Sequence, residues 1–300
     1  MRSCRVFPSL VALALLLPSP VASIPAAART LVVGATIFPV ADIARRVAGP
    51  HARVIQVLPA GASPHTFDLT PVQVRELQPA RLIFKIGGLD DWIDGVVESL
   101  PRAVIVPMHK RIARRPFHDD GHGHGAAQGE EEFDPHYWLS AANGAIMART
   151  IADTLSTIDP AHAPIFAENC RNFAEELAGL HGELKQTLAV LKNKRMIVLH
   201  DGWRYFAAAY GLEIAAVFQP SPGQEPTPRE LQQLYAAARH SGARAIFSEP
   251  QLPAASLEPL LRDLGLALVV LDPLGGAQPG DSYAALLRRN ARAVLQALGR

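Results

Sequence analysis

The chain has 300 residues, of which 49% are hydrophobic and 19% are charged, and its formal net charge is +1. This length is comfortable for two domains that each bury a core. The near-neutral charge, without a basic stripe or a block of like charges, excludes nucleic acid from the expected partners.

Residues 1–28 form a predicted signal peptide. Arg2 and Arg5 precede the apolar run LVALALLL at residues 10–17, and helix breakers and small residues suited to cleavage follow it. The run is too short to anchor the chain in a bilayer, so we expect an exported mature protein. Cys4 precedes the run, whereas the lipid-bearing cysteine of a bacterial lipoprotein follows it.

The first half of the chain alternates between strand and helix patterns. Four nearly continuous apolar runs are typical of parallel strands that are covered on both faces. These runs lie at residues 30–38, 53–59, 80–88 and 102–108. Amphipathic helices are predicted between them at residues 39–49 and 70–78. Residues 29–158 are therefore predicted to form an N-terminal α/β lobe.

The second half repeats this organisation. Its four predicted strands lie at residues 195–200, 213–218, 244–250 and 267–273. Helices are predicted at residues 227–242 and 282–299. Residues 194–300 therefore form a predicted C-terminal α/β lobe. The predicted fold class is α/β, with two lobes that each hold a four-stranded, mainly parallel sheet.

A long helix is predicted between the lobes, at residues 159–193. Asp159 and Pro160 suit a helix start. Apolar residues then recur at steps of three and four, which defines one buried stripe. The stripe comprises Phe166, Cys170, Phe173, Leu177, Leu180, Leu184, Leu188 and Leu191. About 30 residues at ~1.5 Å each give a rod of roughly 45 Å, long enough to cross both lobes.

Four side chains are candidate metal ligands. His65 is in the loop after the second strand, and His136 follows a glycine-rich tract in the segment DPHYWLS. His200 and Asp272 each end a strand of the second half. Ligands of α/β sheets bind beyond the carboxyl ends of the strands. Closure of the two lobes on each other is expected to bring the four side chains together.

Three imidazoles and one carboxylate suit a tetrahedral Zn²⁺, whereas Ca²⁺ and Mg²⁺ prefer oxygen ligands. Four protein ligands leave no place for a reactive water, so such a site holds its ion. Glu249 also ends a strand. It is expected to accept a hydrogen bond from an imidazole N–H or to replace Asp272 as fourth ligand, and a buried structural carboxylate is the alternative.

A histidine-rich segment, residues 117–132, contains HDDGHGHG and is followed by acidic residues. His118, His122 and His124 lie among its glycines. The segment is interpreted as a loop that collects or senses metal, and the alternative is a polar linker. Because glycine raises the entropy of the free loop, metal there is expected to bind more weakly than in a preformed site.

Five segments resemble, in order, the signatures of the solute-binding proteins of metal-ion ABC transporters (cluster A-I). They are LPAGASPHTFDLTP, DPHYWLS, LHDGWRYFAAAYGL, IFSEPQ and VVLDPLG. The nearest branch is the zinc-uptake proteins of the bacterial periplasm, and the resemblance covers the whole mature chain. It implies two lobes joined by one long helix, with the metal between them on His65, His136, His200 and Asp272.

Three details refine this resemblance. Manganese-binding relatives commonly have Glu where this chain has His200, which favours zinc. The fourth ligand varies within the zinc branch, so water or Glu249 could take the place of Asp272. Relatives commonly carry Asp and Pro after WLxx, where this chain has SAAN. That difference affects the helix start after His136 and leaves the ligand unchanged.

The function implied by the resemblance is periplasmic capture of Zn²⁺ and its delivery to a cognate ABC permease, without enzymatic activity. The protein is expected to be a monomer, and a periplasmic metallochaperone is left open as a further partner. Manganese is the runner-up ion. A zinc hydrolase that uses Asp272 as its base and a surface adhesin are the two competing hypotheses from other functional classes.

Overall fold

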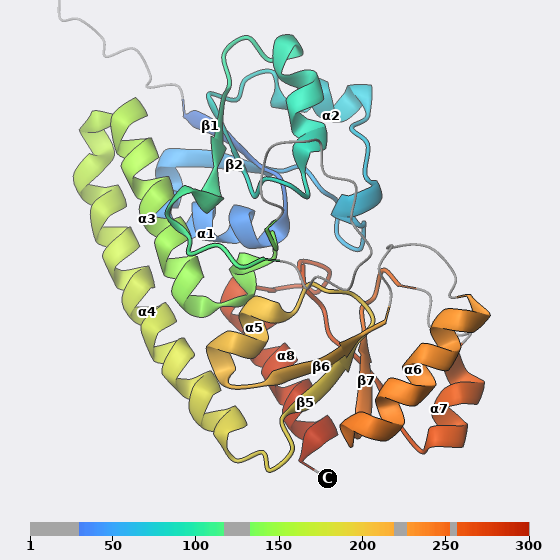
Figure 1. Cartoon of the computed structure of the whole chain (residues 1–300). Helices are drawn as coiled ribbons and strands as arrows, with labels where there is room; N and C mark the ends of the chain where they lie inside the picture. The colour runs from blue at the N-terminus through green and yellow to red at the C-terminus, as the bar shows by residue number, and fades with distance from the viewer. Residues whose placement is uncertain (1–29, 117–132, 219–226, 253–256, 300) are drawn as a thin grey trace, which may run out of the picture.

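The computed structural model describes residues 30–116, 133–218, 227–252 and 257–299. Its strands form two four-stranded sheets, one above the other in Figure 1. The first has the order β2-β1-β3-β4 and the second the order β6-β5-β7-β8. Among the described residues every pairing within the two sheets is parallel. The predicted α/β class is therefore confirmed.

Seven of the eight strands fall inside the predicted apolar runs, and β2 begins one residue before its run. The first sheet contains β1 (Leu31–Ala35), β2 (Ala52–Gln56), β3 (Leu82–Lys85) and β4 (Val104–Pro107). The second contains β5 (Arg195–Val198), β6 (Glu213–Val217), β7 (Ala245–Ser248) and β8 (Ala267–Val270). All residues of β3 and β7 are buried, as expected for strands covered on both faces.

Helices cover these sheets. Those of the first half are α1 (Phe38–Ala48), α2 (Pro71–Leu77) and α3 (Ala141–Ile158). Those of the second half are α5 (Arg204–Tyr210), α6 (Pro228–Ser241), α7 (Glu258–Leu264) and α8 (Tyr283–Leu298). Within the described ranges no helix is long and apolar enough to cross a membrane.

The long helix α4 occupies Ala163–Ala189, after a 3₁₀ turn at Pro160–His162. Its 27 residues span about 40 Å at ~1.5 Å each. The predicted apolar stripe is buried, and Cys170 is a buried free thiol within it. Helix α4 packs against α1 and α3 at one end and against α5 and α8 at the other, so it runs along one side of both lobes (Figure 1).

Buried hydrogen bonds also join the two halves. The Trp138 indole Nε1 donates to the Pro273 carbonyl at 2.7 Å. The hydroxyl of Tyr283 donates to the Ser140 carbonyl at 3.0 Å, and the Tyr210 hydroxyl accepts from the backbone N–H of Ala141 at 3.1 Å. These bonds fix the segment that follows His136 against the C-terminal lobe.

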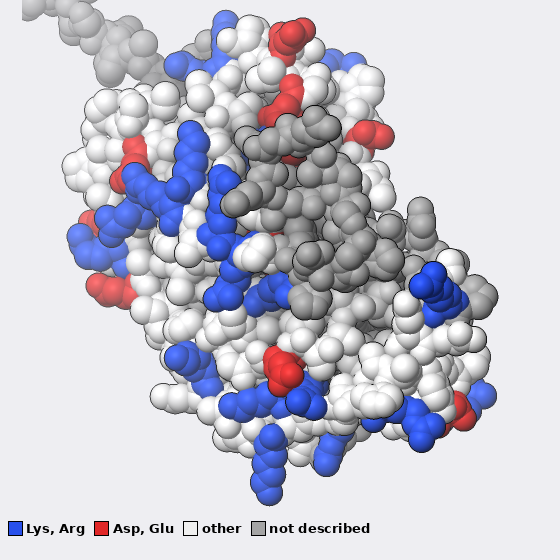
Figure 2. Space-filling model, viewed as in Figure 1, with Lys and Arg blue, Asp and Glu red and all other residues white. Residues whose placement is uncertain are grey.

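Lys and Arg side chains extend across both lobes on the face shown in Figure 2, with few acidic side chains between them. Arg111 pairs with Asp153 at 2.6 Å. Arg115 lies over the Tyr205 ring at 5.7 Å, and the Tyr205 hydroxyl accepts from the Arg115 backbone N–H at 3.0 Å. The contacts between Arg115 and Tyr205 join the two lobes, because Arg115 belongs to the N-terminal lobe and Tyr205 to the C-terminal one.

The predicted signal peptide, 1–28, and the histidine-rich segment, 117–132, lie outside the described residues. His118, His122 and His124 therefore keep the interpretation given to them from the sequence.

Candidate metal centre

His65 lies in the 3₁₀ turn Pro64–Thr66, between β2 and α2. The turn is supported on both sides. The Trp92 indole donates to the Pro64 carbonyl at 3.0 Å, and Thr70 and Gln73 form a reciprocal capping box at the start of α2. Among the described residues neither ring nitrogen of His65 has a hydrogen-bond partner, which leaves both available to an ion.

His136 is buried and its ring is held by Asp134. One oxygen of Asp134, Oδ1, accepts from the backbone N–H of His136 at 2.8 Å and contacts its Nδ1 at 2.8 Å. A neutral imidazole that donates from Nδ1 presents the lone pair of Nε2 to a metal. The role of Asp134 was not predicted, although an aspartate two residues before a backbone N–H is a recognisable Asx turn.

His200 and Glu249 follow β5 and β7, which are neighbours in the second sheet. The Nδ1 atom of His200 lies 3.0 Å from Glu249 Oε1. The same oxygen accepts from the Trp203 indole at 2.9 Å. Glu249 therefore makes the contact expected of a carboxylate that orients an imidazole, and Nε2 of His200 is left free for a metal.

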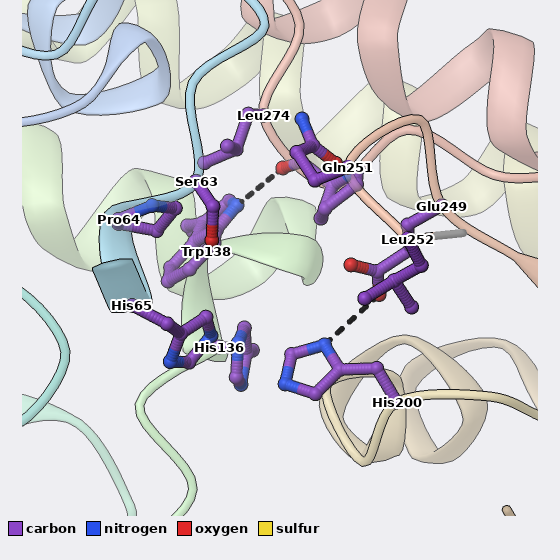
Figure 3. Close-up of a pocket in the computed structure, with 11 residues that line it drawn as sticks. Ser63, Pro64, His65, His136, Trp138, His200, Glu249, Gln251, Leu252 and Leu274 are labelled. Atoms are coloured by element: carbon purple, nitrogen blue, oxygen red, sulfur yellow. Dashed lines mark hydrogen bonds and ion pairs between the residues drawn. The ribbon is translucent and has the colours of Figure 1, made fainter. Parts of the chain in front are cut away.

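The three histidines converge although they are far apart in sequence. One ligand atom from each of His65, His136 and His200 can be chosen so that all lie within 4.8 Å of one another. Their ring centroids are 4.7 to 5.6 Å apart, and the imidazoles face one another in Figure 3. A tetrahedral Zn²⁺ at ~2.0–2.1 Å from each nitrogen holds them about 3.4 Å apart, so small side-chain shifts suffice.

The surroundings of His65 and His136 favour the neutral form of both imidazole rings. The His65 residue is exposed as a whole, yet loss of solvent around its ring and repulsion from His136 and His200 lower the pKa of His65 to about 3. Burial and the His200 charge hold the pKa of His136 well below its ordinary value. Both rings thus offer lone pairs to a cation at neutral pH.

His200 behaves differently from the other two histidines. Burial by itself lowers its pKa, but the charge and the hydrogen bond of Glu249, together with the charges of Asp134 and Asp201, outweigh burial and raise the pKa of His200 above its ordinary value. Burial also raises the pKa of Asp134, to about 7, against the hydrogen bond from the His136 backbone. Of the three imidazoles, His200 is therefore the one for which protons compete most with an arriving cation.

Asp272 does not join the three-histidine group found in the described part of the chain. Its Oδ1 accepts from the backbone N–H groups of Leu274 and Gly275, both at 2.9 Å. Its backbone N–H donates to Asn290 at 3.0 Å. The structure thus places this carboxylate oxygen in a local turn, and it is Glu249 that lines the pocket of the histidines.

The pocket is small and lies between the lobes. Besides the histidines and Glu249, its walls comprise Ser63, Pro64, Trp138, Gln251, Leu252, Pro273 and Leu274. Its cavity volume is about 20 Å³, and a water molecule needs at least about 10–15 Å³ of such space. The enclosed space is therefore of the size that an ion or a water molecule occupies.

A two-lobed α/β protein that gathers three imidazoles from both lobes in one ion-sized pocket is, by fold and site, a metal-ion solute-binding protein. The family described as "ZnuA: Zinc-uptake complex component A periplasmic" matches residues 33–297. The chain belongs to this family.

Known proteins agree with this assignment. The "High-affinity zinc uptake system protein ZnuA" of Paracoccus denitrificans (strain Pd 1222) is 33% identical over 312 residues, covering 93% of this chain and 95% of the relative. A crystal structure of ZnuA covers 90% of this chain and 99% of its own, with a TM-score of 0.80 and 27% identity. The resemblance seen in the sequence is thus confirmed.

Two further structures contain metal. A zinc-bound ZnuA with residues 138–173 deleted has a TM-score of 0.75 and 26% identity, covering 90% of this chain and 98% of its own. The protein FpvC of Pseudomonas aeruginosa, in complex with Mn²⁺, has a TM-score of 0.78 and 25% identity, covering 90% and 99%. Zinc is the ion of the family, and a similar fold also accommodates manganese.

Proposed function

We propose that this protein captures Zn²⁺ between its lobes in the periplasm and delivers it to the permease of an ABC transporter. The observation that carries the proposal is the convergence of His65, His136 and His200 within 4.8 Å. His65 and His136 supply nitrogens from the N-terminal lobe and His200 supplies one from the C-terminal lobe. An ion bound by all three stabilises the closed arrangement of the lobes.

We assign the fourth coordination position to a water molecule. Asp272 was the first candidate, but its Oδ1 is engaged by two backbone N–H groups. Glu249 already accepts from His200 and Trp203 through one oxygen. A site with three nitrogen ligands and one water suits Zn²⁺, which binds as a tetrahedral ion, better than Mn²⁺, which favours oxygen-rich octahedral sites.

The zinc hydrolase hypothesis also has three histidines and a water, and cavity size argues against it. A cavity of about 20 Å³ has no room for an ester or amide beside the ion. Asp272, the base of that hypothesis, is engaged in its own turn. The adhesin, the metallochaperone and the monomeric state stay predictions.

Release to the permease is proposed to need modest movements. Helix α4 packs on elements of both lobes, and a continuous helix resists bending over its length. The Trp138 to Pro273 hydrogen bond adds a second connection close to the pocket. Shifts of loops and side chains, rather than a wide rotation of the lobes, are therefore expected to open the site.

Competitive titration of the purified apo-protein with Zn²⁺ and Mn²⁺ tests the proposal. We expect tight binding of Zn²⁺ in preference to Mn²⁺, and loss of that binding in His200→Ala. His240→Ala is the matched control, because His240 is exposed on α6 and lies in none of the site segments. Equal zinc affinity in His200→Ala and His240→Ala contradicts the proposed site.

Delivery is tested separately, in cells that carry the permease and lack their own copy of this protein. The wild-type protein is expected to restore zinc uptake, and His200→Ala is expected to fail although it is exported to the same level. Zinc uptake by the variant at the wild-type rate contradicts a transport role for the site.

A further inference from the structure

The turn that carries His65 is held from both sides by one indole, that of Trp92. The Nε1 atom of Trp92 donates to the carbonyl of Pro64, the residue before His65, at 3.0 Å. The ring of Trp92 also meets that of Phe67, two residues after His65, in an edge-on contact with centroids 4.9 Å apart. Trp92 therefore contacts the chain immediately before and shortly after a proposed zinc ligand.

The loop around His65 has few other hydrogen bonds. Among the described residues, the Trp92 bond is the one hydrogen bond that reaches residues 59–69 from elsewhere in the fold. Inside the loop, the backbone bonds made by Ala62 and Thr66 measure 3.2 and 3.4 Å, at or beyond the long end of the range for N–H···O bonds. The position of the His65 backbone therefore depends strongly on Trp92.

Trp92 is itself placed by contacts with the end of β3. It lies in the 3₁₀ segment Asp91–Ser99, where Asp91 Oδ1 accepts from Lys85 Nζ at 2.8 Å. The preceding Asp90 is fully buried and accepts from two backbone N–H groups of the turn after β3, both at 2.7 Å. These bonds make Trp92 a fixed support for the more loosely held turn of His65.

We propose that Trp92 is a positioning residue for His65 and slows the release of zinc from the site. This inference rests on the proposed zinc site. A ligand on an already ordered backbone loses less freedom when it binds, and after leaving the ion it stays close enough to bind again. Loss of the Trp92 support therefore speeds zinc release through His65. The competing explanation is that Trp92 and Phe67 only pack against the core of the N-terminal lobe.

Trp92→Phe tests the proposal, because it keeps an aromatic ring beside Phe67 and removes the donor to Pro64. The net contribution of one hydrogen bond corresponds to a factor of roughly two to ten in an equilibrium constant. We expect zinc to leave the variant faster by about this factor in stopped-flow competition with a chelator. Val97→Ala is the matched control and should equal the wild type, since Val97 lies on the same 3₁₀ segment and is 37% exposed.

A double-mutant cycle with His65→Ala separates positioning of His65 from a general effect on the fold. If Trp92 acts through His65, adding Trp92→Phe to His65→Ala leaves the rate of zinc release unchanged. Equal acceleration by Trp92→Phe with and without His65 overturns the proposal, because Trp92 then acts through packing. A wild-type rate of release from Trp92→Phe overturns it as well.

The same measurements distinguish failure of this inference from failure of the zinc site. Zinc release from His65→Ala at the wild-type rate contradicts His65 as a ligand and removes the basis of the inference. Faster release from His65→Ala, together with a wild-type rate in Trp92→Phe, leaves the site intact and overturns the role of Trp92 alone.

Thermal unfolding of the apo-proteins shows whether each variant folds. If Trp92→Phe does not fold, the cycle is repeated with Phe67→Leu, which removes the ring contact on the other side of His65. The same dependence on His65 is then expected, and its absence overturns the proposal.

Discussion

Replacing Glu249 by glutamine tests how the carboxylate beside His200 controls zinc binding. The substitution keeps the shape of the side chain and an oxygen that can accept from His200 Nδ1 and from the Trp203 indole, which now lie 3.0 and 2.9 Å from Oε1. It removes the negative charge. Any change in zinc affinity therefore reports the charge of Glu249 rather than a cavity or a lost contact.

The expected loss at alkaline pH follows from the role of such a carboxylate. It makes the imidazole a more basic ligand, and its removal typically weakens metal binding 10–100-fold. In free energy this is about 1.4–2.8 kcal/mol. We expect Glu249→Gln to lose affinity in this range at pH 8, the alkaline end of the measured range, where protons compete least for His200.

The dependence of zinc affinity on pH separates the charge of Glu249 from packing effects. A packing effect lowers the affinity by the same factor at every pH, whereas loss of the charge changes how the affinity depends on pH. In the wild type, Glu249 raises the pKa of His200 above 6.5, so protons compete with zinc as the pH falls through and below that raised value. In Glu249→Gln the largest of the causes that raise the pKa of His200 is gone, and the charges of Asp134 and Asp201 remain against burial. The pKa of His200 is therefore lower in the variant than in the wild type. Competition then begins at lower pH, and the difference in affinity between the two proteins shrinks from pH 8 to pH 5.

Competition with a chromophoric zinc chelator, measured from pH 5 to pH 8.5, provides the assay. Glu175→Gln is the control, because Glu175 is exposed on α4 and far along the chain from every site segment. Parallel curves for the wild type and Glu249→Gln, separated by a constant factor, would falsify the proton-competition argument. A wild-type affinity that is flat between pH 7 and pH 5 refutes it as well.

Two substitutions test the packing that holds the lobes. Gly276 has φ +80°, and a Cβ there would lie 2.8 Å from the ring of Phe38, whereas Gly280 has φ +73° and open space around it. Gly276→Ala is expected to lower the free energy of unfolding by about 1–3 kcal/mol more than Gly280→Ala, and equal losses in urea denaturation refute the clash. Leu180 lies on the buried stripe of α4 and is 1% exposed, whereas Val190 beyond its end is 71% exposed. Leu180→Ala is expected to cost about 2–5 kcal/mol and Val190→Ala under about 0.5 kcal/mol, and similar denaturation midpoints contradict this assignment of the stripe.

Secondary structure was predicted correctly where burial produces a simple pattern of apolar residues in the sequence. The strands β3 and β7 are buried along their whole length, so they appear as nearly continuous apolar runs that end on Lys85 and Ser248. Helix α3 was not predicted beyond its start, because small and polar residues interrupt its apolar pattern. Gly144 shows why: a Cβ there would lie 2.5 Å from the ring of Tyr283, which is on α8. Such a contact depends on tertiary packing and leaves no local signal.

The sequence also indicated part of the candidate metal site. Each histidine stands in a segment with recognisable context, and the structure brings the three imidazoles together. Asp272 was chosen because it follows a strand, yet its Oδ1 accepts from the backbone of Leu274 and Gly275. The sequence DPLGG carries a signal for this turn, since Asp before Pro and Gly commonly binds its own backbone.

The three histidine rings are not held equally firmly before zinc binds. This difference predicts which of them contributes most to zinc affinity. His136 is 2% exposed and its ring is fixed by Asp134, so its ordering is complete before zinc arrives. His65 is exposed and has no hydrogen-bond partner in the described part of the chain. Ordering one free side chain on binding costs about 1 kcal/mol, which is roughly a fivefold change in affinity.

We therefore expect His65→Ala to weaken zinc binding roughly fivefold less than His136→Ala, since part of what His65 contributes is offset by its own ordering. Chelator competition at pH 8 measures both variants, and stopped-flow release of zinc shows whether the difference lies in dissociation. A greater loss in His65→Ala means that this loop is ordered before the ion binds. On the present reasoning His65 is the first ligand to detach when zinc leaves, because it is the exposed one. The opposite result would mean that another ligand detaches first.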